Sequence, residues 1–173
     1  MKRLSLIFAL LAVFPTAKVG AQSKDQMIAD WQRAKAYTKS YLDAMPESGY
    51  SFKPTPEMRT FAAQMLHLAD ANYYFASSAS AKPSPIGQVS AEKTFAQTKE
   101  ATTKAAMDSY DFVISCIQSM SLAQFQETAK VEGKVVPKGI IFNKAFEHQT
   151  HHRGQTTVYL RLKGVKPPEE MLF

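Results

Sequence analysis

Residues 138 to 163, KGIIFNKAFEHQTHHRGQTTVYLRLK, contain three of the four histidines of this 173-residue chain. His148 and His152 are four residues apart, so on an α-helix they share one face, with about 5–6 Å between their Cβ atoms. Two imidazoles at this spacing can bind one metal ion, as in H-E-x-x-H sites, although no glutamate stands between these two. His151 lies about 100° around the helix from His152 and is not expected to join that site.

The apolar pattern of the same stretch indicates where this pair points. Its helix face also carries Ile141, Ala145, Gln155, Tyr159 and Leu162, so the pair is expected to face the protein interior. A buried imidazole without a partner is costly. Three interpretations therefore stay open: a pair of metal ligands, a hydrogen-bonded pair in the core, or a helix rotated so that both rings are exposed.

The N-terminus has the pattern of a secretory signal peptide. Lys2 and Arg3 precede an apolar run over residues 4–14, and Val19-Gly20-Ala21 resembles a cleavage site. The run is shorter than the about 20 residues that a spanning helix needs. We therefore expect a signal peptide over residues 1–21, cleavage after Ala21, and a single domain over residues 22–173. That domain would be periplasmic or secreted, with no membrane anchor.

Charge and cysteine content narrow the class of partners. Removing Lys2, Arg3 and Lys18 leaves 18 basic against 15 acidic residues, a net charge of +3 in place of +6. The remaining lysines do not cluster with aromatic residues, so no nucleic-acid partner is expected. Cys116 is the only cysteine, which excludes an intrachain disulfide and predicts an inert thiol in the core.

Apolar residues at three- and four-residue intervals predict four amphipathic helices. They span residues 25–44, 56–78, 90–120 and 138–163. The second is expected to begin with Thr55 as N-cap and Pro56 at the first helical position. Residues 80–88 are long enough to cross one end of a bundle. The helical pattern is lost over residues 121–137, where a short hairpin could turn at Glu132-Gly133 and form a wall or lid over the histidines.

Four helices with a long connection before the last one predict an all-α four-helix bundle. The second helix carries His67 on its buried face. A lone histidine on an apolar face is more often a core residue than a ligand. The inward-facing pair on the last helix, His148 and His152, strengthens the case that His67 is a ligand, because bundles build metal sites from side chains on facing helices.

Two motifs match a known family. The string His148-Gln149-Thr150-His151-His152-Arg153-Gly154-Gln155 is followed by Thr157-Val158-Tyr159-Leu160-Arg161 and a stop at Gly164. Upstream, Pro54-Thr55-Pro56-Glu57 precedes Phe61, Gln64 and His67. From Trp31 to Gly164 the chain resembles the DinB/YfiT-like superfamily. That resemblance implies a four-helix bundle whose metal is held by His67, His148 and His152, with His151 at a position that is often histidine but not a ligand.

The resemblance also implies a chemistry. Three neutral imidazoles leave a coordination position open, which is typical of catalytic sites, and they suit zinc or nickel. The ion would lower the pKa of water or of a substrate thiol. Superfamily members include transferases and isomerases that use low-molecular-weight thiols such as bacillithiol or mycothiol, but a secreted protein is separated from cytosolic thiols. We therefore expect a hydrolase or a thiol-dependent transferase acting on an unknown small molecule; the alternative is a bundle that binds a metal or small ligand without turnover.

The residues around the histidines carry further expectations. Gln155 is a candidate for substrate binding or a core hydrogen bond, and Glu147 and Gln149 are expected at the surface. Arg153 is expected to face outward or toward a partner chain, and Gly154 to permit close approach of another helix. The face of the histidines shows no carboxylate that could act as a base. The content of 11 Phe and 7 Tyr favours an apolar patch and a homodimer. Metal binding is expected to weaken as the pH falls through about 6.5.

Overall fold

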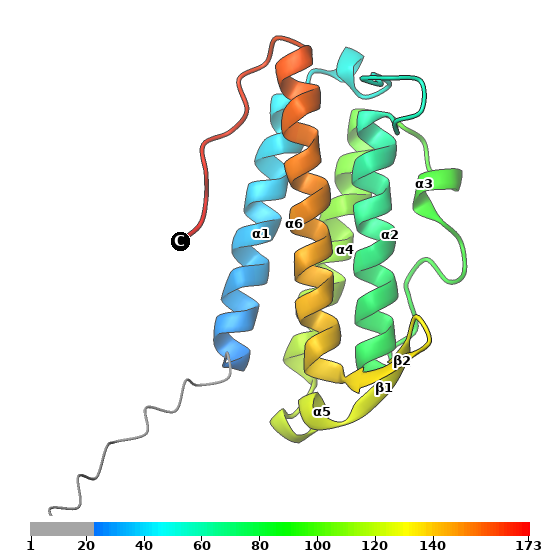
Figure 1. The fold of residues 1–173 in the computed structure, drawn as a ribbon, viewed down its shortest axis with the longest axis vertical. Helices are drawn as coiled ribbons and strands as arrows, with labels where there is room; N and C mark the ends of the chain where they lie inside the picture. Colours follow the sequence, from blue (N-terminus) through cyan, green and yellow to red (C-terminus); the bar gives the residue numbers. More distant parts are fainter. Residues whose placement is uncertain (1–22) are drawn as a thin grey trace, which may run out of the picture.

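The computed structural model describes residues 23–173, and its four long helices form a bundle (Figure 1). These helices are α1 (Lys24–Ala44), α2 (Phe61–Ser80), α4 (Lys99–Ser119) and α6 (Lys138–Leu162). The prediction of a four-helix bundle is confirmed. The expected signal peptide, residues 1–21, and its cleavage point lie outside the described residues. Within residues 23–173, no helix combines the length and apolarity required to span a membrane.

The connections contain shorter elements. They are η1 (Glu47–Gly49), α3 (Ala91–Thr94), α5 (Leu122–Gln126), β1 (Thr128–Val131) and β2 (Lys134–Pro137). The antiparallel strands pair Thr128 with Pro137 and Val131 with Lys134. Glu132 and Gly133 connect them with positive φ of 48° and 78°, the conformation that a two-residue hairpin turn requires. The predicted hairpin is confirmed.

Each helix of the bundle packs against two others. Both α1 and α2 contact α4 and α6, so α1 and α2 occupy opposite corners. The side chain of Lys24 bonds the carbonyl of Gln118, whereas that of Lys99 bonds the carbonyl of Met45; α1 and α4 are therefore antiparallel. Helices α2 and α4 run in the same direction (Figure 1).

The parallel arrangement of α2 and α4 changes the expected path of the chain. Residues 81–98 do not cross an end of the bundle. They return along the outer side of α2, because α4 starts at the same end as α2 (Figure 1). Thr60, just before α2, bonds Gln97, just before α4, at 2.6 Å. The return segment carries α3 past the middle of α2.

Helix α2 begins later than predicted. The side chain of Thr60, not Thr55, accepts from the backbone of Ala63 at 2.9 Å. The first amides of the helix, Phe61 and Ala62, donate to the carbonyls of Phe52 and Tyr50. These bonds satisfy donors that a helix start leaves without partners, so the preceding residues form turns instead of helix.

The predicted helix over residues 90–120 is interrupted. Helix α3 ends at Thr94, and Thr98 caps α4 by accepting from the backbone of Ala101 at 3.2 Å. The break lets residues 91–94 lie against α2 while α4 enters the bundle. Glu92 consequently lies beside α2.

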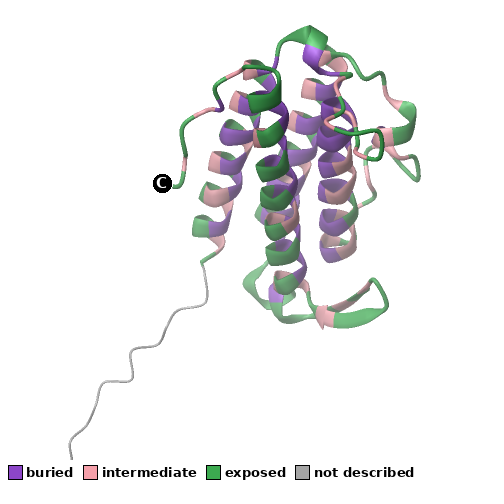
Figure 2. Cartoon of the chain, turned by 45° about the horizontal axis from the view of Figure 1, so that its top comes forward, coloured by how far each residue is buried: buried purple, intermediate pink, exposed green. Residues whose placement is uncertain are grey.

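The core lies between the four long helices, whose buried residues face one another (Figure 2). Its largest fully buried side chains include Trp31, Tyr50, Phe61, Tyr110, Phe142 and Tyr159. Aromatic edges meet faces across the bundle, for example Trp31 and Tyr110 with ring centroids 5.7 Å apart. This packing fixes the relative positions of α2 and α6, on which the site is built.

Candidate metal centre

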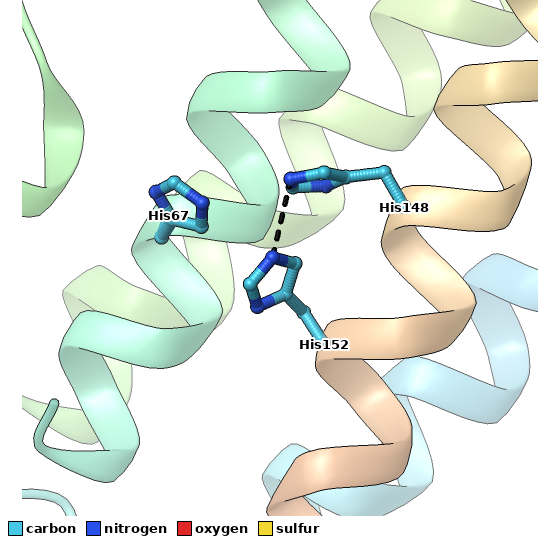
Figure 3. Close-up of side chains that lie close together, drawn as sticks. All are labelled: His67, His148 and His152. Atoms are coloured by element: carbon cyan, nitrogen blue, oxygen red, sulfur yellow. Dashed lines mark hydrogen bonds between the residues drawn. The ribbon is translucent and has the colours of Figure 1, made fainter. Parts of the chain in front are cut away.

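His67 on α2 and the pair His148 and His152 on α6 point toward one another (Figure 3). The ring centroid of His152 lies 4.6 Å from that of His67 and 4.3 Å from that of His148. One ring nitrogen from each histidine can be chosen so that all three lie within 4.8 Å of one another. The helices therefore bring His67 to a pair of histidines that lies more than 80 positions further along the chain.

The outer nitrogen of His67 has a carboxylate partner. Its Nδ1 lies 3.0 Å from Oε2 of Glu92 on α3, so Nδ1–H can donate to the carboxylate. This bond fixes the tautomer and leaves the lone pair of Nε2 toward the other two rings. Glu92 could not be assigned to the site from the sequence, because residues 90–120 have the periodicity of one continuous helix.

Asp70 holds Glu92 in place. Its carboxylate accepts from the Ser90 hydroxyl at 2.7 Å and from the backbone amides of Ala91 and Glu92 at 2.6 and 3.1 Å. Asp70 is three residues after His67 and lies on the same face of α2. One turn of α2 thus supplies both a histidine of the site and the anchor for its carboxylate partner.

Arg59 adds a positive charge at the edge of the site. Its Nε lies 2.7 Å from Oε1 of Glu92, and its backbone carbonyl accepts from the Tyr159 hydroxyl at 2.9 Å. The Arg59 side chain is 41% exposed, so the guanidinium remains accessible from solvent. This residue also escaped the sequence analysis.

His152 has an amide partner. Its Nδ1 lies 2.9 Å from the Gln64 side chain, which also contacts the side chain of Gln155. An amide group presents both an oxygen and an N–H₂. The Gln64 atom nearest Nδ1 is the amide nitrogen, whose N–H donates to Nδ1 in this orientation. With the amide turned so that its oxygen faces Nδ1, Gln64 would accept the Nδ1 proton and leave the Nε2 lone pair of His152 available to a metal. Gln155 is exposed rather than in the core, and it reaches the histidines only through Gln64.

His148 completes the cluster. Its Nε2 lies 3.1 Å from Nε2 of His152. Its buried Nδ1 has no hydrogen-bond partner within residues 23–173. Two nitrogens bound to one tetrahedral zinc at about 2.0–2.1 Å stand about 3.3–3.4 Å apart. The spacing of these two Nε2 atoms is close to that value, so the donor set fits a divalent ion.

The protonation state also suits ligation. Burial lowers the pKa of His148 to about 4 and that of His152 to about 3, with like-charge repulsion between the clustered rings adding to the shift. Both rings are therefore neutral at pH 7, as metal ligands must be. Protons compete for these two nitrogens well below pH 6.5, lower than the unperturbed histidine value suggested.

The other faces of α6 differ in part from the expectations. Glu147 is exposed as predicted, and His151 is exposed as well. The predictions for Gln149 and Arg153 were wrong, because both are buried, with exposed fractions of 0% and 8%. The prediction for Gly154 was also wrong: a Cβ built at Gly154 meets no atom within 4 Å, so no helix approaches it closely.

Cys116 lies in the core, as the sequence predicted. It is fully buried on α4 and its Sγ accepts from the Ser80 hydroxyl at 3.2 Å. Burial raises the pKa of the thiol, which keeps it protonated and unreactive. Its position on α4 excludes it from the histidine cluster.

Comparisons with solved structures concern the fold. The most similar solved structures include a DinB-like protein from Bacillus cereus, with 19% identity, a TM-score of 0.76, and 86% of this chain and 98% of that chain covered. A DinB-like protein from Bacillus subtilis has 18% identity, a TM-score of 0.67, and coverages of 86% and 96%. YfiT from Bacillus subtilis has 15% identity, a TM-score of 0.61, and coverages of 87% and 93%. At these identities the likeness shows a shared fold.

Two further comparisons concern the sequence. The search of curated proteins found no match. The model of the DinB family matches residues 19–171, which is nearly the whole chain and includes all three clustered histidines. The chain belongs to the DinB family.

Proposed function

We propose that this protein is a metal-dependent enzyme, a hydrolase or a thiol-dependent transferase, whose metal is held by His67, His148 and His152. The observation that carries the proposal is the convergence of three imidazole nitrogens within 4.8 Å of one another. Protein zinc sites with three ligands and an open position are typically catalytic rather than structural. Imidazole ligands suit zinc and nickel.

The neighbouring side chains prepare these ligands. Glu92 accepts the Nδ1 proton of His67. Gln64 would accept that of His152 once its amide is turned so that the oxygen faces Nδ1. Each bond leaves Nε2 deprotonated toward the cluster and fixes the ring orientation. Burial keeps His148 neutral without such a partner.

A bound divalent ion would supply Lewis acidity, which lowers the pKa of water or of a thiol enough to make a nucleophile at neutral pH. The chain supplies two charged groups beside that position. Glu92 is within hydrogen-bond distance of His67, and the exposed guanidinium of Arg59 can stabilise negative charge that develops on a substrate. The salt bridge between them at 2.7 Å keeps both groups oriented.

One structural neighbour supports this reaction class. YfiT from Bacillus subtilis is described as "a probable metal-dependent hydrolase with an unusual four-helix bundle topology". The shared fold is compatible with the same class of chemistry here, whereas the reaction itself must be tested on this chain.

Metal content tests the ligand set. Elemental analysis of the purified full chain should find about one divalent transition metal per chain. His67→Ala, His148→Ala and His152→Ala should each lose most of it. His151→Ala is the matched control, because His151 is the exposed neighbour of His152 and should retain the metal. Equal metal content in all four variants would show that these are core histidines and would overturn the proposal.

Turnover tests the reaction class. Ester, amide and thiol-conjugation substrates should be screened with metal-loaded wild type, with metal-stripped protein and with His152→Ala. Turnover should require the ion and disappear in the variant. Activity that persists unchanged in His152→Ala would exclude the metal mechanism, and a loaded protein inactive toward every class would favour the binding bundle without turnover.

A further inference from the structure

A surface cavity of about 600 Å³ adjoins the histidine cluster at His148. Helix α6 forms its floor, Phe75 on α2 forms one side, and the β1–β2 hairpin forms the other. The ring centroid of Phe75 lies 6.0 Å from that of His148. Two other cavities, of about 460 and 720 Å³, lie along α1 and α6 and include none of the three clustered histidines.

The walls of this cavity are apolar. They are formed by Phe75, Val131, Val136, Ile140 and Ile141. Val131 and Val136 come from the two strands and pack against the main core. The hairpin thus forms a wall beside His148, whereas His67 and His152 do not line this cavity. The volume of the cavity is within the range of pockets that bind small molecules, about 300–1,000 Å³.

The charged residues at the rim balance one another. Glu132 and Lys134 flank the hairpin turn, and Lys144 and Glu147 form an ion pair at 2.6 Å on α6. Two lysines are therefore matched by two glutamates. Such a rim offers no excess of positive charge to an anionic ligand. The apolar walls therefore dominate the choice of ligand.

We propose that this cavity binds the substrate through a neutral apolar group, an acyl, alkyl or aryl moiety, and places the adjoining reactive bond at His148. This inference rests on the proposed function, because the histidine cluster defines which end of the cavity is reactive. It adds a substrate class and assigns the β1–β2 hairpin as the element that selects it.

Neighbouring residues of β2 provide a matched pair of variants. Successive side chains of a strand point to opposite faces. Val136 is half-buried and lines the cavity, whereas Val135 is 68% exposed and does not line it. Val136→Trp fills the cavity, and Val135→Trp adds the same side chain on the outer face of the same strand.

The test uses two fluorescent probes with the same ring system. N-Phenyl-1-naphthylamine is neutral, and 8-anilinonaphthalene-1-sulfonate carries an added negative charge. Wild type should bind the neutral probe more tightly than the sulfonate. Val136→Trp should weaken binding of the neutral probe about tenfold, the effect of losing about 60 Å² of apolar contact. Val135→Trp should change it less than about twofold.

Several outcomes would overturn the inference. Equal probe affinity of Val136→Trp and Val135→Trp, tighter binding of the sulfonate by wild type, or no binding of the neutral probe would each do so. If circular dichroism shows that Val136→Trp is unfolded, Ile140→Trp narrows the cavity from α6, where Ile140 is 42% exposed.

Metal analysis of the same samples separates this inference from the proposed function. If the protein contains its metal but Val136→Trp does not change its affinity for the neutral probe, the apolar cavity is excluded as the binding site. The proposed metal site is then retained. A metal-free protein that shows the expected probe pattern would retain the cavity and remove the metal mechanism.

Discussion

Helix α6 buries polar side chains on two faces, and the two faces satisfy them differently. Toward α1 and α4, Gln149 accepts hydrogen bonds from Arg153 and from the Tyr110 hydroxyl, both at 2.8 Å. Toward α2, His148 and His152 contact each other, and His148 keeps a buried Nδ1 without a partner within residues 23–173. The hydrogen-bonded residues of the first face, Gln149, Arg153 and Tyr110, form what we call the structural lock. The second face has the pattern of a ligand site.

Residues of α1 complete the structural lock. The Tyr110 hydroxyl also bonds Thr38 on α1 at 2.7 Å, and the Arg153 guanidinium lies 4.4 Å from the ring centroid of Tyr37. Burial raises the pKa of Tyr110 to about 12, so the phenol remains a donor. Satisfied polar groups rigidify a core, whereas an unsatisfied buried group calls for an explanation such as a water molecule, an ion or a functional role. The difference teaches that burial of a polar residue does not by itself identify a site.

Breaking the lock should have the largest effect on stability. Gln149→Leu removes the acceptor shared by Arg153 and Tyr110, and leaving buried donors unpaired costs about 2–4 kcal/mol. Urea unfolding measures the loss. Gln118→Leu, at an exposed position of α4, should stay within about 0.5 kcal/mol.

The same variant also tests whether the two faces are independent. The folded fraction of Gln149→Leu should keep the metal content of wild type, because none of its contacts reaches the histidine cluster. Loss of the ion from protein that is still folded would show that the lock and the site are one unit.

Removing the carboxylate behind His67 should have a smaller effect, and on metal affinity. Glu92→Ala should weaken metal binding about 10–100-fold, as removal of such outer partners does. Glu92→Gln keeps an acceptor and should lose less. Glu100→Gln, exposed on α4, is the matched control and should bind like wild type. Competition with a chelator measures all three, and wild-type affinity in Glu92→Ala would exclude the positioning role.

The smallest expected effect is at Gly154, which is exposed on the side of α6 that points away from both faces. A Cβ there meets nothing within 4 Å, so Gly154→Ala should stabilise the helix by about 0.5–1 kcal/mol. Thermal unfolding measures it. A destabilised variant would indicate a partner at this surface, and metal content should not change.

Much of the fold follows from local pattern. Helical periodicity located α1 and α6 to within a few residues, and the Glu132-Gly133 turn predicted the hairpin because few dipeptides adopt two positive φ angles readily. The spacing of His148 and His152 is a property of any helix. The start of α2 could not be predicted, because the carbonyls of Tyr50 and Phe52 that bind its first amides come from a separate turn.

The sequence by itself indicated a bundle and placed three histidines on the apolar faces of two helices, because periodicity assigns residues to faces. Only the tertiary structure decided which buried polar residues bond one another in the core and which keep an atom without a hydrogen-bond partner. Gln149 finds Tyr110 39 positions away, and Glu92 reaches His67 25 positions away through a chain reversal that Asp70 holds. Hydrogen-bond satisfaction depends on partners that are distant in the sequence, so no local pattern encodes it.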